Sequence, residues 1–308
     1  MMKSLNDQID KSGNISHRLI SRKLWIFLAT CLLSLVTGAP ALADGPTFVS
    51  GAGFGSPSER TRSLAVGDLN GDGMLDVVVG NVIVSSATFA YQDSAIYFND
   101  GNAAFVDSGN DLDDTRLSGN LVHLVDIDTD GDLDIFIAYM TVGDGAFISR
   151  VYCNDGNGAF AKSTYDLPFG TLFCDLDRDG DADAFVKEPG SGYRVLLNDG
   201  SGGFAECWST ADEAITYEPF DAAFADLNRD GYVDIVDTNG SWSDPGSTCV
   251  LIGDGRGAFE RRSCGIPATR AAWPLIADFD ADGDLDLFVP VYGMRGGPNV
   301  VWLNELSE

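Results

Sequence analysis

Aspartates recur at alternate positions in one short stretch of the chain, residues 126–136, which reads Asp-Ile-Asp-Thr-Asp-Gly-Asp-Leu-Asp-Ile-Phe. Five carboxylates this close together repel one another in any fold, because each raises the electrostatic cost of ionising its neighbours. A bound cation would remove that cost. The stretch therefore indicates a cation site.

The same nine-residue pattern, Asp-x-Asp/Asn-x-Asp-Gly-x-x-Asp, occurs five times in the chain, at 68–76, 126–134, 175–183, 226–234 and 278–286. We number its positions 1 to 9 and name the copies acidic loops 1 to 5. Side chains at positions 1, 3, 5 and 9 converge, glycine at position 6 permits a sharp turn, and position 7 offers its backbone carbonyl. Hard oxygen ligands on a flexible loop suit Ca²⁺ better than Mg²⁺. We expect up to five calcium ions, one per loop.

The predicted calcium ligands follow from these offsets, with position 7 contributing its carbonyl. They are Asp68, Asn70, Asp72, Met74 and Asp76; Asp126, Asp128, Asp130, Asp132 and Asp134; Asp175, Asp177, Asp179, Asp181 and Asp183; Asp226, Asn228, Asp230, Tyr232 and Asp234; and Asp278, Asp280, Asp282, Asp284 and Asp286. A solvated acidic turn is the alternative for any single loop. An EF-hand is disfavoured, because it requires a bidentate Glu at position 12, where loop 1 has Val79.

The loops belong to a longer repeat, with successive spacings of 58, 49, 51 and 52 residues. A second signature, close to Asn-Asp-Gly followed by Phe, ends at Phe105, Phe160, Phe204 and Phe259. Asn-Asp-Gly is typical of a hairpin turn. Each unit reads as four short strands, and a four-stranded repeat of about 50 residues has the size of a propeller blade. The sequence predicts an all-β fold.

The two ends of the chain predict how the fold closes. The fifth unit stops at residues 300–305 without the Asp-Gly-x-x-Phe that should follow, whereas residues 44–48 read Asp-Gly-Pro-Thr-Phe. A strand from Phe48 can complete the last blade, which leaves no sheet edge open. We predict a β-propeller of five four-stranded blades, closed by pairing the N-terminal strand with the last blade and forming a single domain over residues 44–308.

Residues 1–43 have the features of a signal peptide. Arg18, Arg22 and Lys23 precede an apolar run over 24–36, and small residues follow at 39–43. Cleavage before Asp44 is the favoured interpretation; a retained anchor and a lipoprotein site at Cys31 are the alternatives. No later apolar stretch is long enough to span a bilayer. We expect a secreted or periplasmic protein whose mature form does not span a membrane.

The chain is strongly acidic, with 47 Asp and Glu against 19 Lys and Arg and a net charge of −28. We therefore expect neither nucleic acid nor an anionic membrane as a partner. The acidic loops hold 21 of the 47 carboxylates, so the acid is concentrated at the predicted metal sites. Since 44% of residues are hydrophobic, the chain can bury a core. We also expect the protein to be a monomer.

These units resemble the FG-GAP/VCBS repeats of integrin α-chain propellers and of many exported bacterial proteins. The resemblance covers essentially all of residues 44–308. It implies a propeller whose calcium loops join the first and second strands of each blade, and it implies roles in adhesion or in binding glycans and proteins. Five equivalent sites favour a structural role for calcium over a catalytic one.

Little in the sequence indicates catalysis. The mature chain has one histidine, His123, which we interpret as a packing residue. The inner-strand carboxylates are assigned to metal, and four others show no mutual pattern: Asp166, Glu188, Glu218 and Asp221. We expect a protein that is not an enzyme, with a propeller glycosidase or polysaccharide lyase as the alternative.

The remaining cysteines and aromatic residues carry weaker predictions. Cys249 and Cys264 flank a predicted hairpin, which favours a disulfide, with buried free thiols as the alternative. Each loop between the second and third strands of a unit carries an aromatic residue that can bind a sugar or peptide or else pack between blades: Tyr91, Tyr139, Tyr193, Trp242 and Tyr292. We expect the protein to be a binding or adhesion module for a glycan or for a cell-surface or extracellular protein.

Overall fold

The structure is a computed structural model, and it describes residues 53–55, 60–82, 93–102, 104–110, 112, 117–141, 146–165, 167–188, 191–210, 222–238, 248–266, 274–290 and 299–306. The predicted signal peptide and the predicted strand at Phe48 lie outside these residues. Residues 51–308 form one compact unit.

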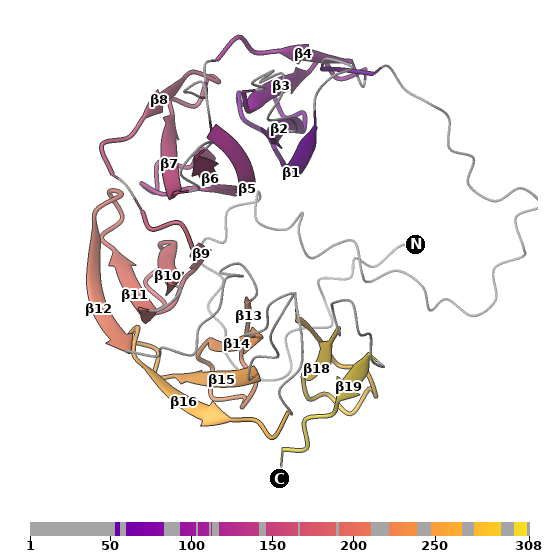
Figure 1. Ribbon diagram of the computed structural model, residues 1–308, viewed down its shortest axis with the longest axis vertical. Helices are drawn as coiled ribbons and strands as arrows, with labels where there is room; N and C mark the ends of the chain where they lie inside the picture. Colours follow the sequence, from indigo (N-terminus) through magenta and orange to yellow (C-terminus); the bar gives the residue numbers. More distant parts are fainter. Residues whose placement is uncertain are drawn as a thin grey trace, which may run out of the picture. The chain divides into compact units, whose positions relative to one another are not determined.

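The described residues form five antiparallel sheets whose strands are neighbours in chain order (Figure 1). The first sheet contains β1 (Thr61–Gly67), β2 (Asp76–Asn81), β3 (Ala95–Asn99) and β4 (Phe105–Asp107). The second contains β5 (Leu117–Val125), β6 (Asp134–Thr141), β7 (Phe147–Asn154) and β8 (Phe160–Lys162). The third contains β9 (Thr171–Cys174), β10 (Asp183–Glu188), β11 (Gly192–Asn198) and β12 (Phe204–Thr210).

The last two sheets differ in strand number. The fourth contains β13 (Ala222–Ala225), β14 (Asp234–Thr238), β15 (Thr248–Gly253) and β16 (Phe259–Ser263). The fifth has three strands, β17 (Leu275–Ala277), β18 (Asp286–Val289) and β19 (Val300–Trp302). The prediction of four-stranded units is confirmed for the first four, and the fifth has three strands within the described residues.

Burial explains why the second strands are rich in apolar residues. Every residue of β14 and all but the last of β10 are buried, whereas the outermost strands β4, β8 and β16 are mostly exposed. A strand that is covered on both faces needs apolar side chains on both faces. The second, third and fourth sheets therefore pack against a neighbour on both faces along their inner strands.

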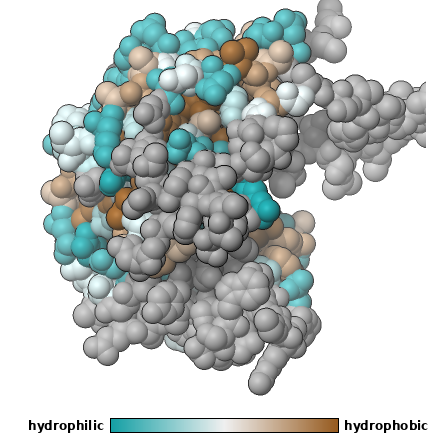
Figure 2. Space-filling view, turned by 45° about the horizontal axis from the view of Figure 1, so that its top comes forward, coloured by the Kyte–Doolittle hydropathy of each residue, from teal (hydrophilic) through white to brown (hydrophobic). Residues whose placement is uncertain are grey.

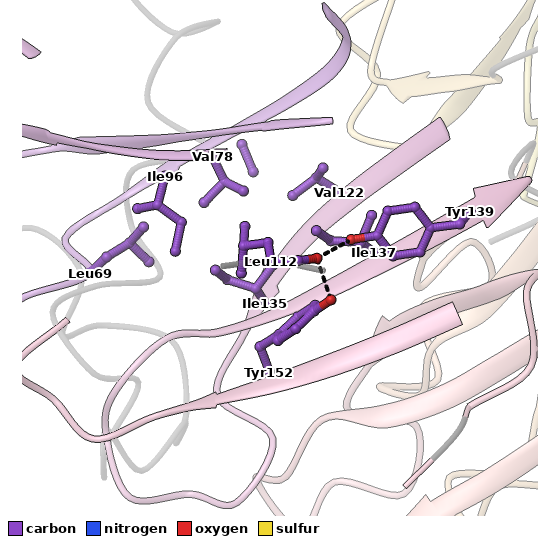
Figure 3. Packing of buried hydrophobic residues seen from close by; sticks show 10 residues of the cluster. Leu69, Val78, Ile96, Leu112, Val122, Ile135, Ile137, Tyr139 and Tyr152 are labelled. Carbon is purple, nitrogen blue, oxygen red and sulfur yellow. Dashed lines mark hydrogen bonds between the residues drawn. The ribbon is translucent and has the colours of Figure 1, made fainter. Parts of the chain in front are cut away.

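Four hydrophobic clusters lie between consecutive sheets. The first joins the first two sheets through residues such as Val78, Ile96, Ile135 and Ile137, whose side chains meet in Figure 3. Three further clusters join the second sheet to the third, the third to the fourth and the fourth to the fifth. The core is thus divided into layers between sheets, as propeller blades require.

The two ends of the sheets differ in the lengths of their connecting loops. Because strands alternate in direction, the loops between first and second strands lie at the same end as the turns between third and fourth strands. At this end the acidic-loop connection is eight residues in every unit, at 68–75, 126–133, 175–182, 226–233 and 278–285. At the opposite end, the loops between second and third strands vary, from 189–191 to 82–94.

Closure of the sheets into a propeller is not established by the described residues. They contain five sheets with propeller-like order, and the strand expected to close the fifth lies outside them. Within the same residues, no helix is long and apolar enough to cross a membrane.

Candidate metal centre

The acidic loops share one set of internal hydrogen bonds. In all five, the amide of the position 6 glycine donates to the position 1 carboxylate, at distances from 2.9 Å for Gly231 to 3.2 Å for Gly180. In all five, the amide at position 7 donates to the position 5 carboxylate at 2.7–3.0 Å. These bonds fold each nonapeptide into the same compact turn and bring its carboxylates together.

The aspartate at position 9 has a second role that the sequence did not indicate. Asp134 begins β6 and is fully buried; its Oδ2 accepts the amide of Ile127 at 2.9 Å and its Oδ1 accepts the amide of Asn154 at 2.8 Å. The position 9 aspartates of the other loops accept the equivalent pair of amides. Position 9 therefore ties the acidic loop to the end of the third strand in every sheet.

Three of the loops bring three carboxylates within 4.8 Å of one another. The groups are Asp126, Asp128 and Asp134 in loop 2; Asp175, Asp177 and Asp183 in loop 3; and Asp278, Asp280 and Asp282 in loop 5. Loops 1 and 4 have Asn70 and Asn228 at position 3. The amide oxygens of these two residues accept the position 5 amide at 3.0 and 2.9 Å, so they lie within the turn beside the carboxylates.

The donor set in loop 2 fits a hard cation. The Oδ1 atoms of Asp126 and Asp128 are buried and have no hydrogen-bond partner. A buried carboxylate oxygen without a partner is costly, and a cation bonded to it removes that cost. Carboxylate and amide oxygens in one turn are the ligands that Ca²⁺ takes in proteins. In loop 2 the predicted ligands that lie within 4.8 Å of one another are therefore those at positions 1, 3 and 9.

Burial perturbs several of these carboxyls. Desolvation raises the pKa of Asp134 to about 7 and that of Asp183 to about 6, against the lowering effect of their two backbone hydrogen bonds. Burial also raises the pKa of Asp126 and Asp175, and the neighbouring carboxylates raise both further. Mutual repulsion at close range is the cost that a bound cation offsets.

Position 4 of each loop has a left-handed backbone. The described residues other than glycine with positive φ are Thr129, Arg178, Arg229 and Ala281, all at position 4 of loops 2 to 5. A left-handed conformation is unfavourable for a side chain, most of all for a β-branched residue such as Thr129 at φ 55°. Its recurrence at one position indicates that the turn itself imposes it.

In the second, third and fifth sheets, an asparagine at the end of the third strand links the acidic loop to the preceding sheet. Asn198 Nδ2 donates to Ile127 O of the second sheet at 2.7 Å and to Ala182 O of its own loop at 3.2 Å. Asn154 and Asn304 make the equivalent pairs of contacts. The fourth sheet has Gly253 here, where a Cβ would lie 2.2 Å from the carbonyl oxygen of Val233, so no side chain fits.

Two of the five aromatic residues predicted to bind a ligand are buried. Tyr139 lies between the first two sheets, and its hydroxyl donates to Leu112 O at 3.0 Å, a contact that Tyr152 shares (Figure 3). Tyr193 is fully buried and its hydroxyl donates to Asp237. Both tyrosines therefore follow the alternative prediction, in which they pack between neighbouring sheets. Neither ring presents a face to a ligand. Tyr91, Trp242 and Tyr292 lie outside the described residues.

Of the histidine and the four carboxylates considered for catalysis, two lie in the described residues. His123 packs against the rings of Phe136 and Phe173, and desolvation lowers its pKa to about 4. Glu188 faces Arg194 at 3.6 Å. Asp166, Glu218 and Asp221 lie outside the described residues.

The predicted disulfide between Cys249 and Cys264 is not formed. Both thiols are free: Cys249 is buried beside the Tyr193 hydroxyl at 3.6 Å, and Cys264 donates to Thr248 O at 3.3 Å. Cys249 lies opposite Ser263 in the β15–β16 pair, so Cys264 is one residue out of register with it. Residues directly opposite share a face of the sheet, whereas the next residue along points to the other face.

A buried ion pair that the sequence did not indicate lies between the third and fourth sheets. Lys187 Nζ lies 2.6 Å from Asp237 Oδ1, and both side chains are at most 1% exposed. The Tyr193 hydroxyl bonds to the other oxygen of Asp237. The sequence signal is a charged residue within the buried part of each second strand, Lys187 in β10 and Asp237 in β14. This cluster joins the two sheets that lack the asparagine contact.

The chain matches two families of repeats. The FG-GAP-like repeat family matches residues 126–186 and 175–236, and the FG-GAP repeat family matches residues 61–97. The chain therefore contains FG-GAP and FG-GAP-like repeats. The matched segments contain acidic loops 1 to 4, so the repeats recognised from the motifs are confirmed.

Two individual proteins are similar to this FG-GAP repeat protein. It is 25% identical over 218 residues to a T-cell immunomodulatory protein homolog of Plasmodium yoelii yoelii, covering 58% of this chain and 31% of that protein. It is 15% identical to the biofilm matrix protein Bap1 of V. cholerae, whose crystal structure aligns with a TM-score of 0.39 over 76% of this chain and 35% of that chain. The chain thus spans about a third of the length of each.

Proposed function

We propose that this FG-GAP repeat protein is an exported, calcium-stabilised five-bladed β-propeller that binds a glycan or a surface protein without enzymatic turnover. FG-GAP repeat proteins are generally extracellular or at a surface and typically are not enzymes. The observation that carries the calcium role is the pair of buried, unpartnered oxygens of Asp126 and Asp128 in loop 2. Calcium at each loop neutralises the carboxylates and fixes the turn between two strands.

Closure into a propeller is supported by the apolar residues that the first and last sheets expose. Figure 2 shows that hydrophobic residues, in brown, lie among hydrophilic ones on one face of the molecule. Phe279 at position 2 of loop 5 is 44% exposed, whereas Leu69, Ile127 and Leu176 at this position are 1% exposed beneath the next sheet. On the first sheet Leu64 is 61% exposed, whereas its equivalent Val122 is 5% exposed. Packing the fifth sheet on the first would bury both faces.

A pocket between the fourth and fifth sheets supports the predicted closing strand. In the second, third and fourth sheets, the Phe that begins the outermost strand packs in the layer against the preceding sheet, as Phe204 does. The fifth sheet has no such Phe, and a cavity of about 320 Å³ lies in that layer, lined mostly by apolar side chains such as Val236, Leu287 and Trp302. We propose that the Phe48 side chain fills this cavity.

The ligand surface is assigned by loop length. The end that carries the acidic loops has the same connection length in every unit, because the metal turn fixes it. The opposite end carries the loops of variable length, including those of Tyr91, Trp242 and Tyr292. Loops of variable length on a rigid scaffold are where binding residues concentrate. We assign ligand binding to this end.

Calcium dependence is tested by thermal unfolding of the mature protein in excess EGTA and in millimolar Ca²⁺, with Mg²⁺ as the control. A ligand that binds only the folded state stabilises it by about 2.7 kcal/mol per site at a hundredfold excess over Kd, so the midpoint should rise with Ca²⁺ and not with Mg²⁺. An unchanged midpoint would exclude the calcium role.

Ligand binding is tested on a panel of glycans and extracellular-matrix proteins with calcium present. The variant Trp242→Ala/Tyr292→Ala should lose saturable binding, and Val106→Ala, on the exposed outermost strand of the first sheet, should keep it. Equal binding by both variants would overturn the assignment of this surface. Turnover of a polysaccharide on the panel would favour the glycosidase or lyase alternative.

A further inference from the structure

We propose that calcium binding in acidic loop 4 is coupled to calcium binding in acidic loop 5 through Arg229, which belongs to one loop and contacts the other. This inference rests on the proposed calcium role and adds a regulatory property to it. It concerns a residue that is not itself a metal ligand.

Arg229 occupies position 4 of loop 4, between the predicted ligands Asn228 and Asp230. Its backbone is held in the left-handed conformation at φ 61°. The amide of the next residue, Asp230, donates to Asn228 Oδ1 at 2.9 Å and to Asp226 Oδ1 at 3.1 Å. A cation bound by positions 1, 3 and 5 therefore fixes the backbone on both sides of Arg229.

The Arg229 side chain lies against loop 5. Its Nη2 is 2.6 Å from Asp284 Oδ1, and a Cβ built on Gly283 would be 3.0 Å from the same nitrogen. These are positions 7 and 6 of loop 5, and position 7 is the residue predicted to offer its carbonyl to the metal. Asp284 Oδ2 also accepts the amide of Leu306 at 3.1 Å, so its carboxylate is held on two sides.

The arrangement provides a physical route for coupling. Metal in loop 4 orders the backbone at Arg229, which lowers the entropy cost of its ion pair with Asp284. The ion pair in turn holds the peptide that loop 5 presents to its own metal. Coupling between binding sites is reciprocal, so metal in loop 5 must favour metal in loop 4 equally.

The other loops supply internal comparisons. Arg178 at position 4 of loop 3 lies over the ring of Tyr232, position 7 of loop 4, with 5.7 Å to the centroid. Thr129 at position 4 of loop 2 donates to Gly200 O of the third sheet at 2.7 Å. Loop 1 has Gly71 at position 4, so no side chain can reach loop 2. Loops 1 and 2 therefore lack this kind of contact.

The test follows the position 6 glycine amides by NMR of the ¹⁵N-glycine-labelled mature protein during calcium titration. Gly231 and Gly283 each donate to the position 1 carboxylate of their own loop and so report loops 4 and 5 separately. Asp230→Asn weakens loop 4 while keeping the oxygen that accepts the Tyr232 amide. Because an ion pair with an exposed partner contributes up to about 1 kcal/mol, Asp230→Asn should raise the Kd of loop 5 about twofold to fivefold.

The control is the same change in the Arg229→Gln background, where the Kd of loop 5 should no longer respond. Asp72→Asn in loop 1 should leave the Kd of loop 2, reported by Gly131, unchanged. Amides that shift with calcium while loop 5 ignores Asp230→Asn, or responds equally in both backgrounds, would overturn the coupling alone. Amides that do not shift with calcium at all would overturn the calcium role and the coupling with it.

Discussion

At the residue scale, position 9 of the acidic loop combines two roles that can be separated. Asp134 accepts two backbone amides, whereas Asp130 is exposed and accepts one. Asp134→Asn replaces one acceptor oxygen by a donor facing a buried amide, so it should destabilise the protein by about 2 to 3 kcal/mol in EGTA at pH 6, before any metal is bound and below the raised pKa of Asp134, where the change relieves little buried charge. Asp130→Asn should cost less than about 1 kcal/mol there. Urea unfolding in EGTA measures both, and equal losses would contradict the role of position 9 in tying loop to strand.

His123 gives a pH dependence with a defined sign. Its ordinary pKa of 6.5 falls to about 4 in the folded protein, because burial beside Phe136 and Phe173 disfavours the charged form. Below pH 6.5 the unfolded chain binds a proton that the folded protein does not, so stability is lost as pH falls from 6.5 towards 4. The loss should approach about 3 kcal/mol.

The variant His123→Phe isolates this contribution, since the carboxylates titrate in both proteins. The difference in unfolding free energy between wild type and His123→Phe should grow in favour of the variant between pH 6.5 and 4.5. A difference that is constant with pH would show that His123 is protonated in the folded state.

Residue type and spacing identified the acidic loops but not the environment of each side chain. The Asp and Gly pattern fixes the local turn, so the shared conformation of all five loops could be predicted, and the metal ligands themselves stay a prediction. Whether Tyr139 and Tyr193 face solvent or a neighbouring sheet depends on contacts between distant residues, which a single sequence does not contain. The pairing of Lys187 with Asp237 and the misregister of Cys264 have the same origin.

At the element scale, the asparagine that ends the third strand determines how strongly neighbouring sheets are joined. Asn198→Ala leaves the carbonyls of Ile127 and Ala182 without their donor in a buried position, so it should cost about 2 to 3 kcal/mol. Asn157→Ala, in an exposed turn, is the matched control and should cost less than about 0.5 kcal/mol. Thermal or urea unfolding distinguishes the two, and similar losses would show that the contact between sheets contributes nothing.

The interface between the third and fourth sheets lacks this asparagine because the backbone of Val233 approaches Gly253 too closely for a side chain. The buried pair of Lys187 and Asp237, with Tyr193, joins these two sheets instead. A buried ion pair is a weaker guarantee of stability than apolar packing, but it penalises any arrangement that leaves one charge alone. The buried ion pair therefore specifies the interface between the third and fourth sheets, whereas an asparagine side-chain amide specifies the other three interfaces.

At the scale of the whole molecule, the repeated sheets allow the exposed apolar faces of the first and fifth sheets to be compared with the equivalent buried faces of the others. Each inner sheet is covered on both faces by a neighbour, so a repeat array must either close or expose two apolar end faces. The first and fifth sheets carry those faces, and the side chains they expose are apolar at positions where the other sheets bury apolar residues. Packing of the fifth sheet on the first would cover both of these faces.

Closure makes a quantitative prediction at Val301 in β19. This residue is 41% exposed, whereas Ile96, Val151 and Val195 at the same position of other sheets are at most 2% exposed. If the fifth sheet packs on the first, Val301→Asp places a charge in an apolar layer and should destabilise the mature protein by at least about 3 kcal/mol. If the array is open, Asp at a solvent-exposed position should change stability by no more than about 0.5 kcal/mol. Val106→Asp, 62% exposed on the outermost strand of the first sheet, should be tolerated in either case and serves as the control. Urea unfolding in millimolar calcium that gives the same stability for Val301→Asp and Val106→Asp would rule out the closed propeller.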